Sequence, residues 1–146
     1  MALQRRKRAR KGETMKKENQ KLCVGLNESA QIIFQNNKEK GFWDKERNVG
    51  EMLMLVTSEL GEAMEAHRKG QFARWENLEK YSNQENTEQR KAGFELHIKD
   101  KFEDEIADAV IRLLDMSAGL GIDLERHINA KVEYNKLRER LHGKIY

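Results

Sequence analysis

The sequence predicts an all-α fold, a bundle of four to five helices that homo-oligomerisation is expected to complete. Three observations lead to this prediction. The composition is 38% hydrophobic and 36% charged, a balance that suits helices with solvated outer faces. The 146 residues include no proline, the commonest helix breaker. Apolar residues recur at helical spacing in four segments, and a chain of this length is expected to form one domain, here residues 18–146.

Two helices are predicted before residue 70. The first covers about residues 18–39 and is expected to end near Gly41. The second covers about residues 48–69, and Gly70 follows it where a left-handed C-terminal cap is favoured. The expected core face of this second helix consists of Leu53, Val56, Leu60, Ala63 and Met64.

The other two helices follow a variable, polar stretch. Residues 71–99 have mixed propensity, and we expect a short helix around 73–80 followed by a loop. The third helix is predicted over about 100–118, ahead of Gly119 and Gly121, and the fourth from an N-cap at Asp123 to about residue 140. The expected core face of the third helix consists of Ile106, Val110, Leu113 and Leu114.

A basic arm, residues 1–17, precedes the predicted domain. Residues 1–21 hold nine Lys and Arg against two acids, a net charge of +7, and the remainder holds 19 bases against 23 acids, a net charge of −4. The arm either binds nucleic acid or another anionic surface, serves as a nuclear address, or is a disordered solvated tail. No apolar stretch follows it, so it does not resemble a secretory signal, and no run approaches the roughly 18 residues of a membrane span. The single cysteine, Cys23, suits a reducing, cytoplasmic location.

Two acid pairs of the same spacing lie in otherwise apolar helices. Glu59 and Glu62 stand in "SELGEAME", and Glu105 and Asp108 stand in "EDEIADAV". Residues three apart share one face of a helix, so each pair forms a stripe that borders the expected core. If the two helices pack antiparallel, four carboxylates converge, and their repulsion calls for a cation. Oxygen ligands without His or Cys favour Mg²⁺, with Mn²⁺ as a substitute.

Two other interpretations of these acids stay open. A single pair at this spacing is most often solvated or paired with Lys or Arg of a neighbouring helix. A di-iron carboxylate bundle would need Glu-x-x-His on two helices, and the sequence offers it once, at Glu139 and His142. The repetition of the acid pair on two helices favours the magnesium site.

Over about residues 42–142 the chain resembles the MazG-like family of all-α nucleoside triphosphate pyrophosphohydrolases. The resemblance rests on E-x-x-E followed by E-x-x-D, on "GIDL", and on the K-x-x-x-N-x-x-R spacing in "AKVEYNKLRERLHGK". Residues 71–99 look like an insertion, because the gap between the two acid motifs is longer than most members of the family show. Pocket shape and specificity are therefore not carried over from the family.

The resemblance implies Mg²⁺-dependent hydrolysis of a (deoxy)nucleoside triphosphate to the monophosphate and pyrophosphate, in house-cleaning or control of the nucleotide pool. The expected metal ligands are Glu59, Glu62, Glu105 and Asp108. Glu59 and Glu62 are the expected catalytic residues, and Glu62 or a neighbour such as Asp104 would orient the attacking water. The sequence does not decide which carboxylate accepts the proton. The family also implies a homodimer or a dimer of dimers, with pockets near the subunit interface.

Substrate contacts are expected from two further places. Lys131, Asn135 and Arg138 share one face of the fourth helix and suit phosphate oxygens, unless this face is simply solvated. Arg112, one turn beyond the second acid pair, is another phosphate candidate.

For the base, Trp43 can stack and Asn48 can form a hydrogen bond, although an aromatic beside a helix start more often packs into the core. A function of another class is a non-catalytic helical module that binds nucleic acid or a protein partner through its basic arm. Such a module has no reason to keep both acid pairs beside its core.

Overall fold

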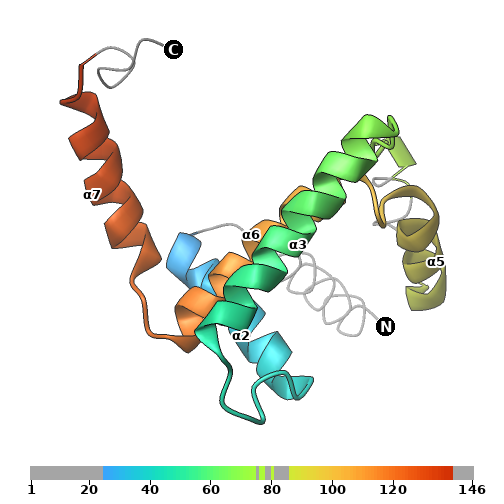
Figure 1. Cartoon of the computed structure of the whole chain (residues 1–146). Coiled ribbons are helices and arrows are strands. Elements are labelled where there is room, and N and C mark those ends of the chain that lie inside the picture. The colour runs from blue at the N-terminus through green and yellow to red at the C-terminus, as the bar shows by residue number, and fades with distance from the viewer. Residues whose placement is uncertain (1–24, 75, 78–79, 81–85, 140–146) are drawn as a thin grey trace, which may run out of the picture.

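The computed structural model describes residues 25–74, 76–77, 80 and 86–139 (Figure 1). These residues form no strand and include five helices with defined bounds, so the all-α prediction is confirmed for them. The helices are α2 (Leu26–Glu39), α3 (Val49–Arg68), α5 (Thr87–His97), α6 (Phe102–Gly119) and α7 (Leu124–Lys136). The basic arm, residues 18–24 of the first predicted helix and His142 lie outside the described residues. Among the helices searched, none has the length and apolar character of a membrane span.

Local signals set the helix ends close to their predicted positions. Asn48 caps α3, because its side-chain oxygen accepts the backbone N–H of Glu51 at 3.1 Å. Gly70 follows this helix with a φ of 65°, the left-handed conformation that glycine adopts without strain. Asp123 caps α7 in the same way as Asn48, accepting the backbone N–H of Arg126 at 3.0 Å.

Two predictions about the helices were wrong: one helix was missed, and another ends earlier than expected. The loop expected after residue 80 contains α5, which begins where Asn86 accepts the backbone N–H groups of Glu88 and Gln89. Asn86 was not predicted as an N-cap, because the polar segment around it has no clear apolar stripe. The fourth predicted helix ends at Lys136 and does not reach residue 140. Residues 76, 77 and 80 are helical, in agreement with the short helix expected around 73–80.

The antiparallel pair of α3 and α6 is the centre of the fold, and α2 packs across α6 (Figure 1). The buried residues of α3 recur every three or four positions, as a single helix face requires: Met52, Val56, Glu59, Ala63 and Ala66. The buried residues of α6 are Glu105, Ala109, Leu114, Asp115, Met116 and Ser117. Acidic side chains therefore lie inside the helix interface, where apolar residues were expected.

Of the residues that the sequence predicted as core on α3 and α6, Val56, Ala63 and Leu114 are buried, and the others are exposed in the single chain. On α3, the exposed positions are Leu53, Leu60 and Met64, at 47–53%. On α6, they are Ile106, Val110 and Leu113, at 38–47%. On each helix these exposed residues form a stripe that lies about 100° around the helix axis from the buried glutamate. Because the two helices run antiparallel, both stripes face the same side of the helix pair. The core prediction was wrong at these positions because the acid-bearing faces meet instead.

Candidate metal centre and adjoining cleft

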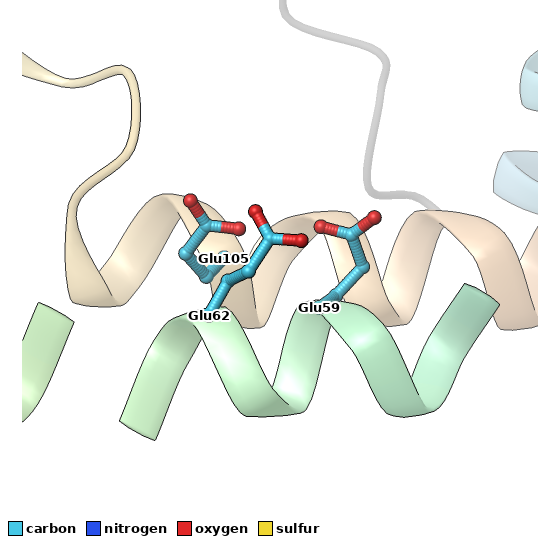
Figure 2. Close-up of side chains that lie close together, drawn as sticks. All are labelled: Glu59, Glu62 and Glu105. Atoms are coloured by element: carbon cyan, nitrogen blue, oxygen red, sulfur yellow. The ribbon is translucent and has the colours of Figure 1, made fainter. Parts of the chain in front are cut away.

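Three glutamates converge between α3 and α6 (Figure 2). Glu59 and Glu62 come from α3 and Glu105 from α6, and one carboxylate oxygen of each lies within 4.8 Å of the others. Glu59 and Glu105 are only 6% and 5% exposed, whereas Glu62 is exposed. The cluster is thus embedded in the helix interface and open on the side of Glu62.

Backbone contacts hold the beginning of α6 beside the end of α3. The N–H of Phe102 donates to the carbonyl of Gln71 at 3.0 Å, and the N–H of Ala73 donates to the Glu103 carboxylate at 2.7 Å. These bonds fix where Glu105, in the first turn of α6, meets α3. An acidic first turn is also favoured by the partial positive charge of a helix N-terminus.

The cluster carries more negative charge than its surroundings neutralise. Burial, the charge of Glu62 and a hydrogen bond with Glu59 raise the pKa of Glu105 to about 7. Burial is also the main cause of the raised pKa of Asp104 and of Asp108. A carboxyl group that holds its proton near neutral pH is a site where a divalent cation can replace that proton.

Asp108 and Arg112 lie at the border of the cluster. Asp108 is not among the three residues whose oxygens converge, so three of the four expected ligands come together and the fourth lies alongside. Arg112 donates from Nε to Oε1 of Glu59 at 2.6 Å and forms an ion pair with it. This arginine therefore reaches the cluster itself, and its expected contact with phosphate stays a prediction.

A cleft of about 460 Å³ adjoins the cluster. Its walls come from α2, α3, α6 and the segment between α2 and α3, and its lining residues are Asn37, Phe42, Arg47, Met52, Leu55, Asp108, Ile111, Arg112 and Asp115. The volume falls within the roughly 300–1,000 Å³ typical of small-molecule sites. Asp108 and Arg112 belong to the cleft, and Arg112 also binds Glu59, so cleft and cluster are continuous.

The structure gives Trp43 a packing role. Its Nε1 donates to Oδ1 of Asp115 at 3.0 Å, and its ring meets Phe34 edge-on at a centroid distance of 5.1 Å. The ring also lies directly against the backbone of Gly119. Trp43 is not among the residues that line the cleft, and this placement matches the core-packing alternative.

Asn48 likewise has a structural partner. Its side-chain oxygen is occupied by the N-cap bond to α3, and Asn48 does not line the cleft. Neither of the two expected base contacts therefore faces this cleft in the single chain.

Sequence reasoning missed Arg47 and Asp115. Asp115 is 5% exposed, accepts from Trp43 and forms an ion pair with Arg47 at 3.5 Å. The signal was present, because Asp115 falls on the same helical stripe as Glu105 and Asp108 within the apolar run "IRLLDMSA". Arg47 had no such signal, since its role depends on a contact with a residue far along the chain.

The predicted phosphate residues of the fourth helix are not brought to the cluster within one chain. Helix α7 extends away from the α3–α6 pair and has no buried residue (Figure 1). It is attached to α2 through Asn27, whose side chain donates to Asp123 at 2.7 Å. Lys131 and Arg138 both lie near the ring of Tyr134, at 4.9 and 6.0 Å from its centroid, and Asn135 is exposed.

The raised pKa of Glu105 predicts that Mg²⁺ binding depends on pH. Between the ordinary pKa of 4.5 and the folded-state pKa of about 7, the folded chain holds a proton that the unfolded chain has lost. Raising the pH through this range therefore destabilises the fold, and a divalent cation bound at the cluster would offset the loss by taking the place of the proton. Below pH 7 the apparent Mg²⁺ affinity is expected to fall by up to about tenfold per pH unit.

Thermal unfolding at pH 6, 7 and 8, in EDTA and in Mg²⁺, measures this dependence. The increase in Tm on adding Mg²⁺ is expected to grow with pH, and Glu105→Gln is expected to remove that trend. An equal increase at pH 6 and pH 8 would contradict the assignment of Glu105 as a ligand.

Comparison with protein-family models, curated proteins and solved structures found no match to this chain.

Proposed function

We propose that the protein is a Mg²⁺-dependent (deoxy)nucleoside triphosphate pyrophosphohydrolase of the MazG-like type, which releases the monophosphate and pyrophosphate in house-cleaning or control of the nucleotide pool. The observation that carries the proposal is the convergence of Glu59, Glu62 and Glu105 from two antiparallel helices, two of them almost fully buried. Buried like charges are costly, and a metal ion relieves that cost.

The donor set fits magnesium. All three groups offer carboxylate oxygen, and the cluster includes no His or Cys, which would favour zinc or another transition metal. Glu59, Glu62 and Glu105 would hold the ion, with Asp108 beside them. Bound Mg²⁺ would neutralise the charge of the triphosphate and polarise its phosphoryl oxygens.

The protein's own residues would bind the triphosphate and move the proton of the attacking water. Glu62 is the exposed member of the cluster, so its carboxylate can orient the water and accept its proton. Asp104 is the second candidate, although it already accepts the backbone N–H of Asp100 at 3.1 Å. Arg112 would exchange part of its contact with Glu59 for a phosphate group, two of whose oxygens a guanidinium can bind with parallel hydrogen bonds.

An assay for pyrophosphate tests this function. The full chain is incubated with each common ribo- and deoxyribonucleoside triphosphate and Mg²⁺, and pyrophosphate and orthophosphate are measured separately. Pyrophosphate release that EDTA abolishes is expected for at least one substrate. Deleting residues 1–17 should leave that activity unchanged. If no triphosphate is cleaved and the deletion abolishes binding to nucleic acid, the non-catalytic alternative replaces the proposal.

We also propose that the chain acts as a homodimer or a dimer of dimers. The support is the apolar stripe on each of α3 and α6, which fall on one side of the helix pair and stay about half exposed. Val110→Lys places a charge in this face and is expected to convert the oligomer to a monomer in light scattering. Leu96→Lys, on α5 and 69% exposed, is the matched control and should leave the mass unchanged. A wild-type chain that is monomeric at micromolar concentration would contradict the proposal.

A further inference from the structure

The cleft runs from the glutamate cluster to the ion pair of Arg47 and Asp115. Asp108 and Arg112 form the end next to the glutamate cluster, and Asp115 with Arg47 forms the other. Asp108 and Asp115 are seven residues apart on α6, or about 10 Å at the helical rise of about 1.5 Å per residue. A nucleotide whose phosphates lie at the cluster would therefore place its base in the part of the cleft near Arg47.

The apolar residues that line the cleft suit a flat heterocycle. Phe42, Met52, Leu55 and Ile111 line the cleft, and Phe42 and Leu55 are 61% and 38% exposed. Sites that enclose an aromatic ring typically combine apolar or aromatic walls with polar groups that fix its orientation, and here the polar lining residues are Asn37, Arg47, Asp108, Arg112 and Asp115. The polar groups among them then decide which base is accepted.

Arg47 is held so that it presents hydrogen-bond donors to the cleft. Its Nη1 lies 3.5 Å from Oδ2 of Asp115, and its guanidinium lies over the ring of Trp43 at 5.3 Å from the centroid. Only 22% of the Arg47 side chain is exposed. Among the described residues this ion pair with Asp115 is its one carboxylate contact, whereas a guanidinium carries five N–H groups.

Asp115 and Asn37, two other polar residues of the cleft, cannot select a base in the way that a guanidinium can. Both oxygens of Asp115 already have partners, Trp43 and Arg47, and the residue is buried. Asn37 carries an amide that both donates and accepts, so it can serve either kind of base edge. Arg47 can only donate, which favours a base edge that only accepts.

We propose that this cleft binds the nucleobase and that Arg47, positioned by Asp115 and Trp43, selects bases with a ring carbonyl, guanine before all others. Guanine presents O6 and N7 side by side as two acceptors, which match the guanidinium fork, whereas adenine presents N7 beside a donor amino group. The proposal rests on the nucleotide function proposed above, and it names Arg47 as a specificity residue of that site.

Measuring how nucleoside monophosphates bind in the absence of metal tests the proposed base preference separately from catalysis. The indole N–H signal of Trp43, assigned with Trp43→Phe, is followed by ¹⁵N–¹H NMR during titration with dGMP or dAMP in EDTA. Since Trp43 contacts both Asp115 and Arg47, a base bound at Arg47 is expected to shift this signal. The wild type should bind dGMP on the order of 10-fold more tightly than dAMP.

Arg47→Lys is the test variant, because it keeps a cation beside Asp115 but loses the planar fork. It is expected to bind dGMP and dAMP alike. Arg68→Lys, an exposed position at the end of α3, is the matched control and should keep the preference. Equal binding of the two nucleotides to the wild type, no shift of the Trp43 signal, or a preference that survives in Arg47→Lys would overturn the proposal.

Comparing steady-state kcat/KM for dGTP and dATP distinguishes a failure of the proposed base preference from a failure of the proposed hydrolase activity. Hydrolysis without a guanine preference refutes the role of Arg47 alone. A selective shift with dGMP and no hydrolysis of any triphosphate refutes the enzyme and leaves a guanine-binding cleft.

Discussion

Glu62→Gln is expected to lower Mg²⁺-dependent pyrophosphate release by at least about 100-fold, since even residues that only support a metal ligand contribute roughly 10- to 100-fold. Glutamine keeps the size of the side chain and an oxygen that can accept from Ser58 Oγ, which lies 3.2 Å from Glu62. What is lost is the negative charge, and with it both a metal ligand and the first candidate for the proton acceptor.

The fold should survive this substitution, which makes the result interpretable. Glu62 is the exposed member of the cluster, and its charge raises the pKa of Glu105. Removing that charge relieves repulsion, so Tm in EDTA should not fall. Glu65→Gln is the matched control, one turn further along α3, where Glu65 forms an exposed ion pair with Lys69 at 3.1 Å. Activity of Glu62→Gln within a few fold of the wild type would remove the cluster from the mechanism.

Gly119→Ala is expected to destabilise the fold by about 2 kcal/mol or more, through overpacking and the loss of a buried hydrogen bond. A Cβ at this position would overlap the six-membered ring of Trp43, with Cζ2 at 2.5 Å and Cζ3 at 2.7 Å. The indole cannot move without breaking its bond to Asp115, which is buried and also anchors Arg47. We expect a decrease in Tm of about 5–10 °C, measured by calorimetry.

Gly61→Ala is the control for this prediction. Gly61 lies in the middle of α3, and a Cβ there would have no neighbour within 4 Å. Alanine is preferred to glycine inside a helix by about 1 kcal/mol, so this variant should be as stable as the wild type or more so. If Gly119→Ala unfolds at the same temperature as Gly61→Ala, Trp43 is not fixed against α6 as the structure has it.

The sequence predicted the parts of the fold that depend on neighbours along the chain. The N-caps at Asn48 and Asp123 and the left-handed Gly70 act within a single helical turn; Asp123 and Gly70 were identified as caps from their residue types, whereas Asn48 was predicted only as the first residue of its helix and as a base contact. The equivalent cap at Asn86 was missed because no apolar periodicity accompanied it, and with it the whole of α5. Local signals therefore predict the helix ends where a clear apolar stripe shows that a helix is present.

The acid spacing also predicted the centre of the candidate site. Residues three apart must share a helix face, so Glu59 and Glu62 were certain to act together if α3 formed. That Glu105 meets them required only that α3 and α6 pack antiparallel through their acidic sides. The cleft could not be predicted, because Arg47 and Asp115 are distant in sequence and become a pair only after α2, α3 and α6 have packed.

What the sequence by itself determined was which segments other than α5 are helices, where most of them begin and end, and which acids share a face, because these properties depend on hydrogen bonds and side chains within a turn or two. The tertiary structure decided which face is buried. Leu60 and Val110 are more hydrophobic than Glu59 and Glu105, yet they are the exposed ones. Periodicity shows that a helix has two faces, whereas the partner helix decides which of them it covers, and here α3 and α6 meet along their carboxylates.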